Sequence, residues 1–522
     1  MLELVKKNIH MDCIKAKAGN QITVEDDVNI PDLRPDIDKV IFHSGVVKIE
    51  EAKAGNGQVT VRGALAVSIL YTSDEEEEPL GKVETNLPFE EQFHMEGVET
   101  GDPVYVRHML EDLSVGIINS RKISIRALMT LELCVREIFD EPAAVDLETE
   151  LQAEYRRKPL QIMETAVCKK DIFRFRHEET LPTHLPNVFE VLYGSVAPGA
   201  LECIAGEDKL LVRGNVKLFF LYSPDGEEGA ARFFETVVPI QGEVPCSGMH
   251  DMMIPCVGVS LGSVEYEVKP DFDGEDRVFA IEAVFDLDIK AYEEKTYEIL
   301  ADMYGITKEI ETQCKEGSFM NLLRRNSGKA RIKERIQLDN ANLMSLIHHE
   351  ETAMLEDVET DGGEMTMMGN VHLRCLYLTN EEMAGYGYME EDIPFVYTME
   401  IGDTAGKNIS QDIQIAIEQM DVTALDSSQM ECNGIISVTA VVFEEKKEPI
   451  ITGASVCELD GDKMKNLPGM VIYIVKPGDS LWQIGKEYYI PVEAIKAMNG
   501  LTKDEIQPGD KLLLMKNAAG DL

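Results

Sequence analysis

An alternation of apolar and polar residues marks one strand that occurs three times in the chain. Every second residue is apolar or glycine in the stretches 59–71, 210–222 and 365–377. The residues between them are mixed, with arginine, lysine, histidine and serine among them. A period of two with one apolar face predicts a β-strand that is buried on one side.

The three copies also keep the same spacing to other residues. In each copy a tyrosine follows a glycine by eight positions, and a proline follows that glycine by 25 positions. The copies are offset by 151 and 155 residues, which sets the size of a repeated module. The glycine predicts a bulge or a close approach of another backbone. These residues are Gly63, Gly214 and Gly369, with Pro88, Pro239 and Pro394.

Each copy of the strand continues into a β module. Acidic turns follow the three tyrosines and predict hairpins; they lie at 72–78, 223–228 and 379–382. Further strands close the modules at 123–135, 278–289 and 435–442. We therefore predict three β-rich, sandwich-like modules, at residues 1–145, 146–305 and 306–456.

The third module is the divergent one. A proline pair precedes the repeated strand in the first two modules, at Pro31 and Pro35 and at Pro182 and Pro186, but not in the third. Between the modules, we expect short helices at 146–157 and 297–316.

A different pattern follows the linker that we predict at 457–470. The stretch Tyr473-Ile-Val-Lys-Pro-Gly-Asp-Ser-Leu-Trp-Gln-Ile484 leads through apolar residues spaced by three to an Asn-Gly-Leu turn and to Ile506-Gln-Pro-Gly509. The spacing of three predicts the core face of a helix. Residues 471–516 resemble the LysM family along their whole length. That resemblance implies a small α+β domain of βααβ order.

The LysM resemblance also implies a ligand groove between the loop before the first helix and the loop after the second. Family members bind N-acetylglucosamine-containing glycans, chiefly peptidoglycan. Asp479, Ser480 and Asn499 are equally typical of helix and turn caps, so each has two open interpretations. Gly485 stands where the family usually has alanine, and it weakens the first helix by about 1 kcal/mol. The residues carried over from the family are Gly478, Asp479, Ser480 and Leu481 on one wall, with Asn499, Leu501, Ile506, Gln507 and Pro508 on the other.

The charge of the chain narrows the choice of partner. Fifty Lys and Arg stand against 95 Asp and Glu, for a formal net charge of −45. Nucleic acids and anionic membranes are poor partners for such a chain, because binding to them depends on Lys and Arg. A basic protein or a neutral glycan fits better, although acidity also serves solubility alone.

The remaining composition predicts a cytosolic protein. Ten cysteines are scattered without a CxxC pair, which predicts reduced thiols. No apolar run reaches 18 residues, so no membrane insertion is expected. The first residues lack the apolar core of a signal peptide.

Three β modules followed by one LysM domain resemble the SipL-like family of clostridial spore-coat morphogenetic proteins, whose modules are SPOCS domains. The resemblance implies a non-enzymatic scaffold in the mother-cell cytoplasm. It further implies binding to the coat-basement ATPase, stage IV sporulation protein A, and recruitment of coat to the forespore surface. No cofactor is implied.

Two alternatives share the LysM domain: a peptidoglycan-binding protein and a LysM-anchored cell-wall hydrolase. We find no HExxH, GxSxG or P-loop motif, and therefore name no catalytic residue. His348 and His349 form the densest histidine cluster. Without an ordered set of Cys or acidic ligands, we expect them to be surface residues and not a metal site.

Overall fold

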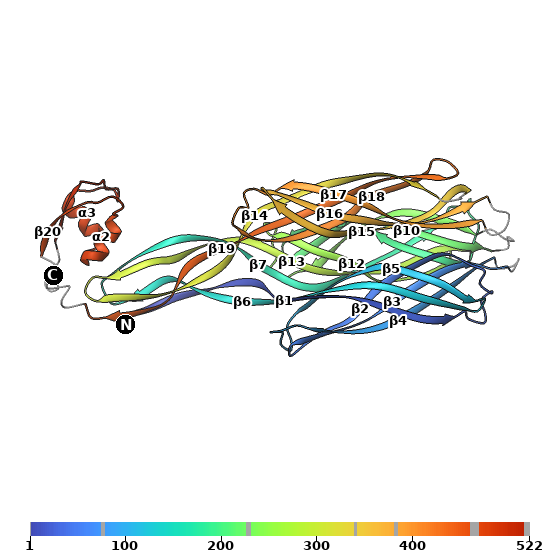
Figure 1. Cartoon of the computed structure of the whole chain (residues 1–522), viewed down its shortest axis with the longest axis horizontal. Coiled ribbons are helices and arrows are strands. Elements are labelled where there is room, and N and C mark those ends of the chain that lie inside the picture. Colours follow the sequence, from blue (N-terminus) through green and yellow to red (C-terminus); the bar gives the residue numbers. More distant parts are fainter. Residues whose placement is uncertain are drawn as a thin grey trace.

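A computed structural model describes residues 2–74, 79–225, 231–338, 342–380, 385–459 and 469–515. Three β lobes lie side by side, a narrow stalk extends from them, and a small module with two helices lies at the far end of the stalk (Figure 1). None of the described helices has the length and hydropathy needed to cross a membrane.

Each lobe is a sandwich of two antiparallel sheets, as the alternating pattern predicts. In the first lobe the middle strand of one sheet is β3(Gln58–Thr72), which contains the predicted strand 59–71 and lies between two neighbours. The two sheets are β1(Leu2–Asn29)–β6(Lys122–Thr149)–β5(Val104–Asn119) and β2(Lys39–Gly55)–β3(Gln58–Thr72)–β4(Leu80–His94).

The second and third lobes repeat this strand order. The second has β7(Ala153–Thr180)–β13(Asp276–Gly305)–β12(Ile254–Pro270) and β8(Val188–Pro198)–β10(Lys209–Pro224)–β11(Arg232–Pro245), with β9(Glu202–Gly206) added beside β10. The third has β14(Glu309–Gln337)–β19(Gln429–Cys457)–β18(Asn408–Ala424) and β15(Leu343–Asp361)–β16(Glu364–Thr379)–β17(Tyr386–Glu400). The predicted hairpins are present as β3–β4, β10–β11 and β16–β17, whereas their turn residues 75–78, 226–230 and 381–384 lie outside the described residues.

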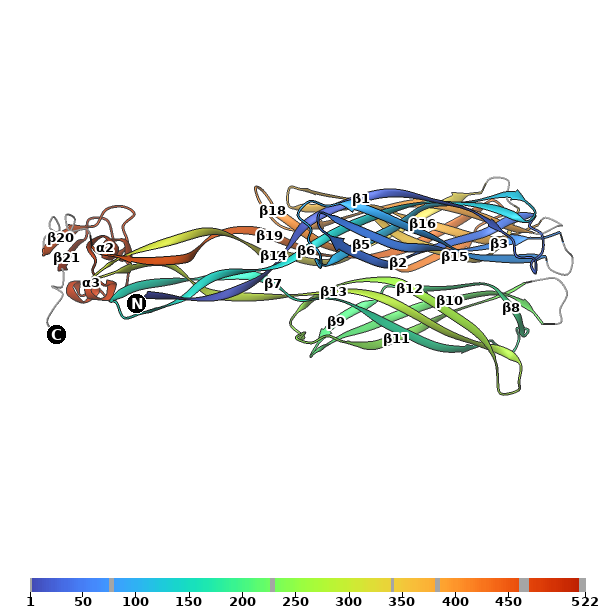
Figure 2. The same ribbon diagram turned by 90° about the horizontal axis from the view of Figure 1, so that it is seen from below.

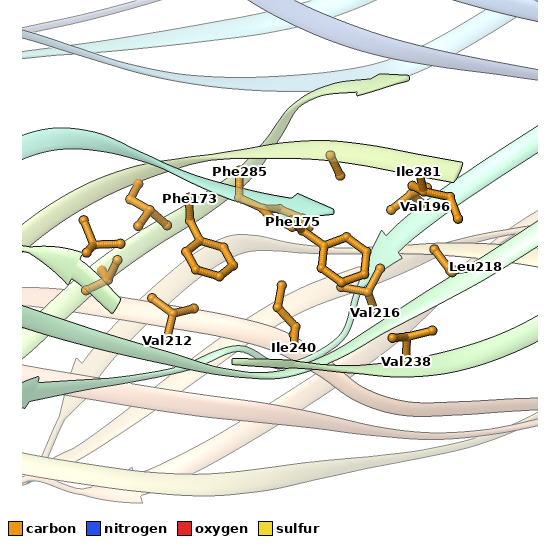
Figure 3. Packing of buried hydrophobic residues seen from close by; sticks show 14 of the residues in the cluster. Phe173, Phe175, Val196, Val212, Val216, Leu218, Val238, Ile240, Ile281 and Phe285 are labelled. Carbon is orange, nitrogen blue, oxygen red and sulfur yellow. The ribbon is translucent and has the colours of Figure 1, made fainter. Parts of the chain in front are cut away.

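The core of each lobe lies between its two sheets. In the second lobe Phe173 and Phe175 of β7 face Val212 of β10 and Ile240 of β11 across this space (Figure 3). All four side chains are buried. The apolar face predicted for the repeated strand is therefore its core face.

The repeated glycines stand where another backbone comes close. A Cβ at Gly63 or Gly369 would collide with the carbonyl oxygen of Lys48 or Met354 on the neighbouring strand. At Gly214 it would lie 2.9 Å from the carbonyl oxygen of Ala200. The partner strands of the first and third glycines also bulge at this point. The prediction of a bulge or a close approach is confirmed.

The repeated tyrosines and prolines also have a structural reason. The hydroxyl of Tyr71 donates to the carbonyl of Pro35 at 2.9 Å, and that of Tyr222 donates to Pro186 at 3.2 Å. The prolines that follow each strand lie on β4, β11 and β17, which end their sheet orders. Edge strands tolerate proline because its missing N–H is not needed by a further neighbour.

The stalk is the main departure from the predicted fold. The expected helices at 146–157 and 297–316 are wrong, because these segments are strands with a short turn. The first and last strands of each lobe continue beyond the sandwich as a two-stranded ribbon. The three ribbons share one core, and every ribbon strand contributes to it: Ile9, Ala143, Leu160, Ile162, Tyr297, Ile299, Phe319 and Ile450.

A ring of lysines joins each ribbon to the next. Lys158 binds Glu448 of the third ribbon at 2.5 Å, and Lys315 binds Glu141 of the first at 3.0 Å. Lys7 lies 4.6 Å from the ring centre of Tyr297 in the second ribbon. The register places the three lysines opposite Ala143, Ile299 and Ile450, so they occupy equivalent positions. The stalk is thus a pseudo-threefold arrangement within one chain.

The lobes also meet each other directly. Apolar side chains of all three lobes form one cluster, which includes Phe42, Phe219 and Leu376. Within this junction Arg374 pairs with Glu350 at 2.8 Å, and the Tyr193 hydroxyl donates to Glu350. Figure 2 shows the second lobe lying along the other two.

Candidate functional site

The module at the far end of the stalk has the predicted βααβ order. Its elements are β20(Met470–Ile474), α2(Leu481–Tyr488), α3(Val492–Asn499) and β21(Lys511–Met515), and the two strands pair antiparallel. The helices pack their apolar stripes against one face of this small sheet, with Ile484, Ile495 and Leu512 buried between them. Most of the linker predicted at 457–470, from 460 to 468, lies outside the described residues.

The loop before α2 is held by its own polar side chains. Ser480 caps the helix in a reciprocal capping box with Gln483. Asp479 accepts hydrogen bonds from the Lys476 backbone N–H at 2.8 Å and from the Tyr473 hydroxyl at 2.7 Å. The pKa of Asp479 is lowered by these two bonds, the backbone bond first. Both predicted site residues therefore have structural partners inside the module.

The loop after α3 is anchored by Asn499. Its side-chain amide donates to the carbonyls of Ile495 and Leu513, at 2.8 and 2.9 Å, and its oxygen accepts from the Leu513 N–H at 2.7 Å. The helix then ends at Gly500, whose φ of 64° suits glycine. The hydrogen bonds of Asn499 fix the end of α3 to β21.

The other predicted site residues differ in exposure. The Leu481 side chain is 1% exposed and belongs to the core, so it offers little surface to a ligand. Leu501 and Ile506 are half-buried. Gly478, Gln507 and Pro508 are exposed. Of the predicted site residues, Gly478, Gln507 and Pro508 are therefore the most accessible, and Leu501 and Ile506 are apolar side chains with partial exposure.

The two histidines singled out in the sequence lie in the lobe junction. His348 is 3% exposed and stacks on Phe219 with ring centres 3.7 Å apart, so the prediction of a surface residue is wrong for it. His349 lies 2.8 Å from Glu351, and only 11% of its side chain is exposed, so it is not a surface residue either. Across the described ranges, no group of three His, Cys, Asp or Glu side chains is arranged to hold a metal ion.

Comparison with known proteins identifies the parts of the chain. Residues 36–118 and 188–269 match the family model described as SipL, SPOCS domain, and residues 473–514 match the LysM domain. The chain carries SPOCS and LysM domains. The matched SPOCS segments contain β2 to β5 and β8 to β12. The third lobe has the same strand order, although the SPOCS match does not extend to it.

Two curated proteins of Bacillus subtilis (strain 168) are similar over short stretches. One, named "Putative sporulation-specific glycosylase YdhD", is 49% identical over 45 residues, which is 9% of this chain and 11% of that protein. The other, named "Uncharacterized protein YkzQ", is 45% identical over 38 residues, which is 7% of this chain and 51% of that protein. No solved structure matches the chain. SPOCS and LysM are non-catalytic domains, and the SPOCS family relates the chain to sporulation.

The sequence did not predict the contact between the LysM domain and the stalk. The indole N–H of Trp482 in α2 donates to Asp302 of β13 at 2.8 Å. The sequence held one hint of this contact: Gly485 lies on the same helix as Trp482 and stands where the family usually has alanine. The meaning of that departure depends on a residue 181 positions earlier, Tyr304, and local sequence cannot show it.

Proposed function

We propose that this chain is a non-enzymatic adaptor of spore assembly, with a SPOCS scaffold and a ligand-binding LysM domain at the end of the stalk. The layout supports this division, because the LysM domain and the lobes lie at opposite ends of the molecule (Figure 1). A partner of the LysM domain and a partner of the lobes could bind the same chain without competing for space.

The LysM domain binds a protein in this proposal. The observation that carries it is the internal use of Asp479, Ser480 and Asn499, whereas the apolar side chains of Leu501 and Ile506 remain partly exposed. Apolar side chains with main-chain groups suit a protein surface. Following the SipL-like resemblance, the partner is the coat-basement ATPase, stage IV sporulation protein A. The chain then acts in the mother-cell cytoplasm and brings coat to the forespore surface.

A binding experiment with purified components tests this proposal. The full chain is titrated with the ATPase and, separately, incubated with purified peptidoglycan. Leu501→Glu and Ile506→Glu should each weaken ATPase binding about tenfold or more, the roughly 1.4 kcal/mol expected when one apolar anchor is lost. Ile472→Glu is the control, because Ile472 is 69% exposed on β20, outside the proposed site. ATPase binding that resists both site substitutions would contradict the assignment of this surface.

Peptidoglycan binding is the second candidate function. LysM domains bind such glycans in the family, and main-chain groups of the two loops can serve a sugar as well as a protein. A relative named as a sporulation-specific glycosylase carries a similar stretch of 45 residues. Saturable binding to peptidoglycan that is lost in Leu501→Glu, with no ATPase binding, would favour this function over the adaptor.

A further inference from the structure

The LysM domain contacts the stalk through one face of α2 and the turn that follows it. Asp302 of β13 accepts from the Trp482 indole at 2.8 Å and pairs with Lys486 at 2.6 Å. The hydroxyl of Tyr304 donates to the carbonyl of Ile490 at 2.9 Å. Three directed contacts thus join two elements that are about 180 residues apart in the chain.

Aromatic packing surrounds these hydrogen bonds. The rings of Tyr304 and Trp482 meet edge to face with centres 5.0 Å apart, and the Arg156 guanidinium lies 5.5 Å from the Trp482 ring centre. Tyr304 is 3% exposed. Edge-to-face and cation–π pairs both add to the attraction between the two surfaces, and more so where water is excluded.

Gly485 fits this contact in a way that alanine would not. A Cβ at this position would lie 2.6 Å from the Tyr304 hydroxyl oxygen and 2.7 Å from the Ile490 carbonyl oxygen. Glycine is less favourable than alanine inside a helix, so this close packing offsets a local cost. Here it allows the tyrosine to approach the helix backbone.

The contact contains both attractive and repulsive charge pairs: Asp302 attracts Lys486, whereas Glu154 and Glu493 repel each other. Burial alone would raise the pKa of Asp302, but its bonds to Lys486 and Trp482 outweigh burial and lower that pKa. Beside it, burial and the nearby Glu493 raise the pKa of Glu154. The LysM segment 471–516 has six lysines and six acidic residues, so the acidic remainder of the chain does not repel it as a whole.

We propose that the stalk tip is a specific binding site for the α2 face of the LysM domain, which caps the stalk as a docked unit. Because both surfaces belong to one chain, this contact is intramolecular, and covalent linkage raises the effective concentration of one surface near the other. A contact of modest intrinsic affinity therefore holds the domain in place. The docking residues differ from the proposed ligand site, so exposed Gln507 and Pro508 stay accessible while the domain is docked.

The motion of Trp482 tests this proposal in the full chain, because it is the only tryptophan. Time-resolved fluorescence anisotropy separates a domain that tumbles with the 58.3 kDa chain from one that moves on its linker. Wild type should show slow decay alone. Asp302→Ala and Tyr304→Phe, both on the stalk, should add a fast component without altering the LysM sequence.

The stalk supplies a matched control at an equivalent position. Asp146 follows the unpaired residue of the first ribbon's bulge, as Asp302 does in the second, but it pairs with Arg157 at 2.7 Å. Asp146→Ala should leave the slow decay unchanged. A fast component already present in wild type would overturn the proposal. So would Asp302→Ala and Tyr304→Phe variants that both keep the wild-type decay.

Discussion

At the residue scale, the repeated glycines show how a spacing in the sequence becomes a packing constraint. Gly63 lies opposite a bulge in β2, where the carbonyl of Lys48 and the ring of Phe89 fill the place of a side chain. The repeated glycine is therefore explained by the close approach of the neighbouring strand and not by an unusual backbone conformation of its own strand. Gly63 is not among the glycines that need a positive φ.

Gly63→Ala should destabilise the first lobe by about 1–3 kcal/mol, the usual cost of forcing atoms into a packed site. Gly19→Ala is the matched control in the same lobe, because its Cβ would lie 3.7 Å from the nearest atom, an ordinary contact. Denaturant unfolding and hydrogen exchange measure the difference. Equal stability of the two variants would contradict the close-approach explanation.

The buried tyrosines give a second residue-scale prediction. Tyr71→Phe and Tyr222→Phe should each cost about 1–3 kcal/mol, because the carbonyl of Pro35 or Pro186 loses its donor. In the third lobe the proline pair is absent, so Tyr377→Phe should cost less. Comparing the free energies of unfolding of the three variants tests this, and an equal loss in all three would count against it.

At the element scale, much of the lobe could be predicted and the stalk could not. The strand 59–71 and the hairpin after it follow from local periodicity and spacing, whereas the edge position of the repeated proline does not. The ribbon segments have no such signal, because their apolar residues face a core made by three segments distant in sequence. Lys7, Lys158 and Lys315 lie 151 and 157 residues apart, which departs from the module offsets of 151 and 155, so their equivalence is visible only once the ribbons are paired. The LysM domain was predictable because its family pattern is local, whereas its docking contact is not.

The junction between lobes gives a prediction of pH dependence. Burial would raise the pKa of Glu350, but Arg374 and then His348 outweigh it and lower that pKa below its ordinary 4.5. A lowered pKa in the folded state means that Glu350 contributes stability above about pH 4.5, and this contribution is lost as the pH falls through the folded-state value. Glu350→Gln should therefore destabilise the chain at neutral pH and flatten its loss of stability in acid.

Unfolding measured from pH 7 to pH 3 checks this prediction, with the exposed Glu90→Gln as the control. Two histidines near the junction change the stability at higher pH than Glu350 does. Burial lowers the pKa of His43, which removes stability as the pH falls below about 6.5, whereas Glu390 raises the pKa of His372, which has the opposite effect. A Glu350→Gln variant that keeps the wild-type slope below pH 4.5 would contradict the role given to Glu350.

At the scale of the whole molecule, the three modules follow one another in the sequence but share two apolar clusters in the structure. The junction cluster links the lobes, and the stalk core draws on all six ribbon strands. The chain passes from one lobe to the next only through the short turns at 150–152 and 306–308, at the far end of the stalk. The predicted limits 1–145, 146–305 and 306–456 describe how the modules follow one another in the sequence. The two shared clusters argue against independent folding of the three modules.

Cutting the chain between lobes should therefore leave the molecule assembled. Protease sites placed at 150–152 and 306–308 would break two peptide bonds, but each fragment would still share the junction and the stalk core with the others. Phe319 has the largest side chain among the fully buried residues of that core, and removal of such a ring typically costs about 3–5 kcal/mol. Gel filtration of the doubly cut chain should give one peak at the intact size, and Phe319→Ala should shift it toward separate fragments. A protease site placed within 460–468 serves as the comparison. After cleavage there, the docking contact alone would hold the LysM fragment of about 50 residues on the stalk. If the doubly cut wild type eluted as three separate lobes, the modules would be independent units and the stalk only a connector.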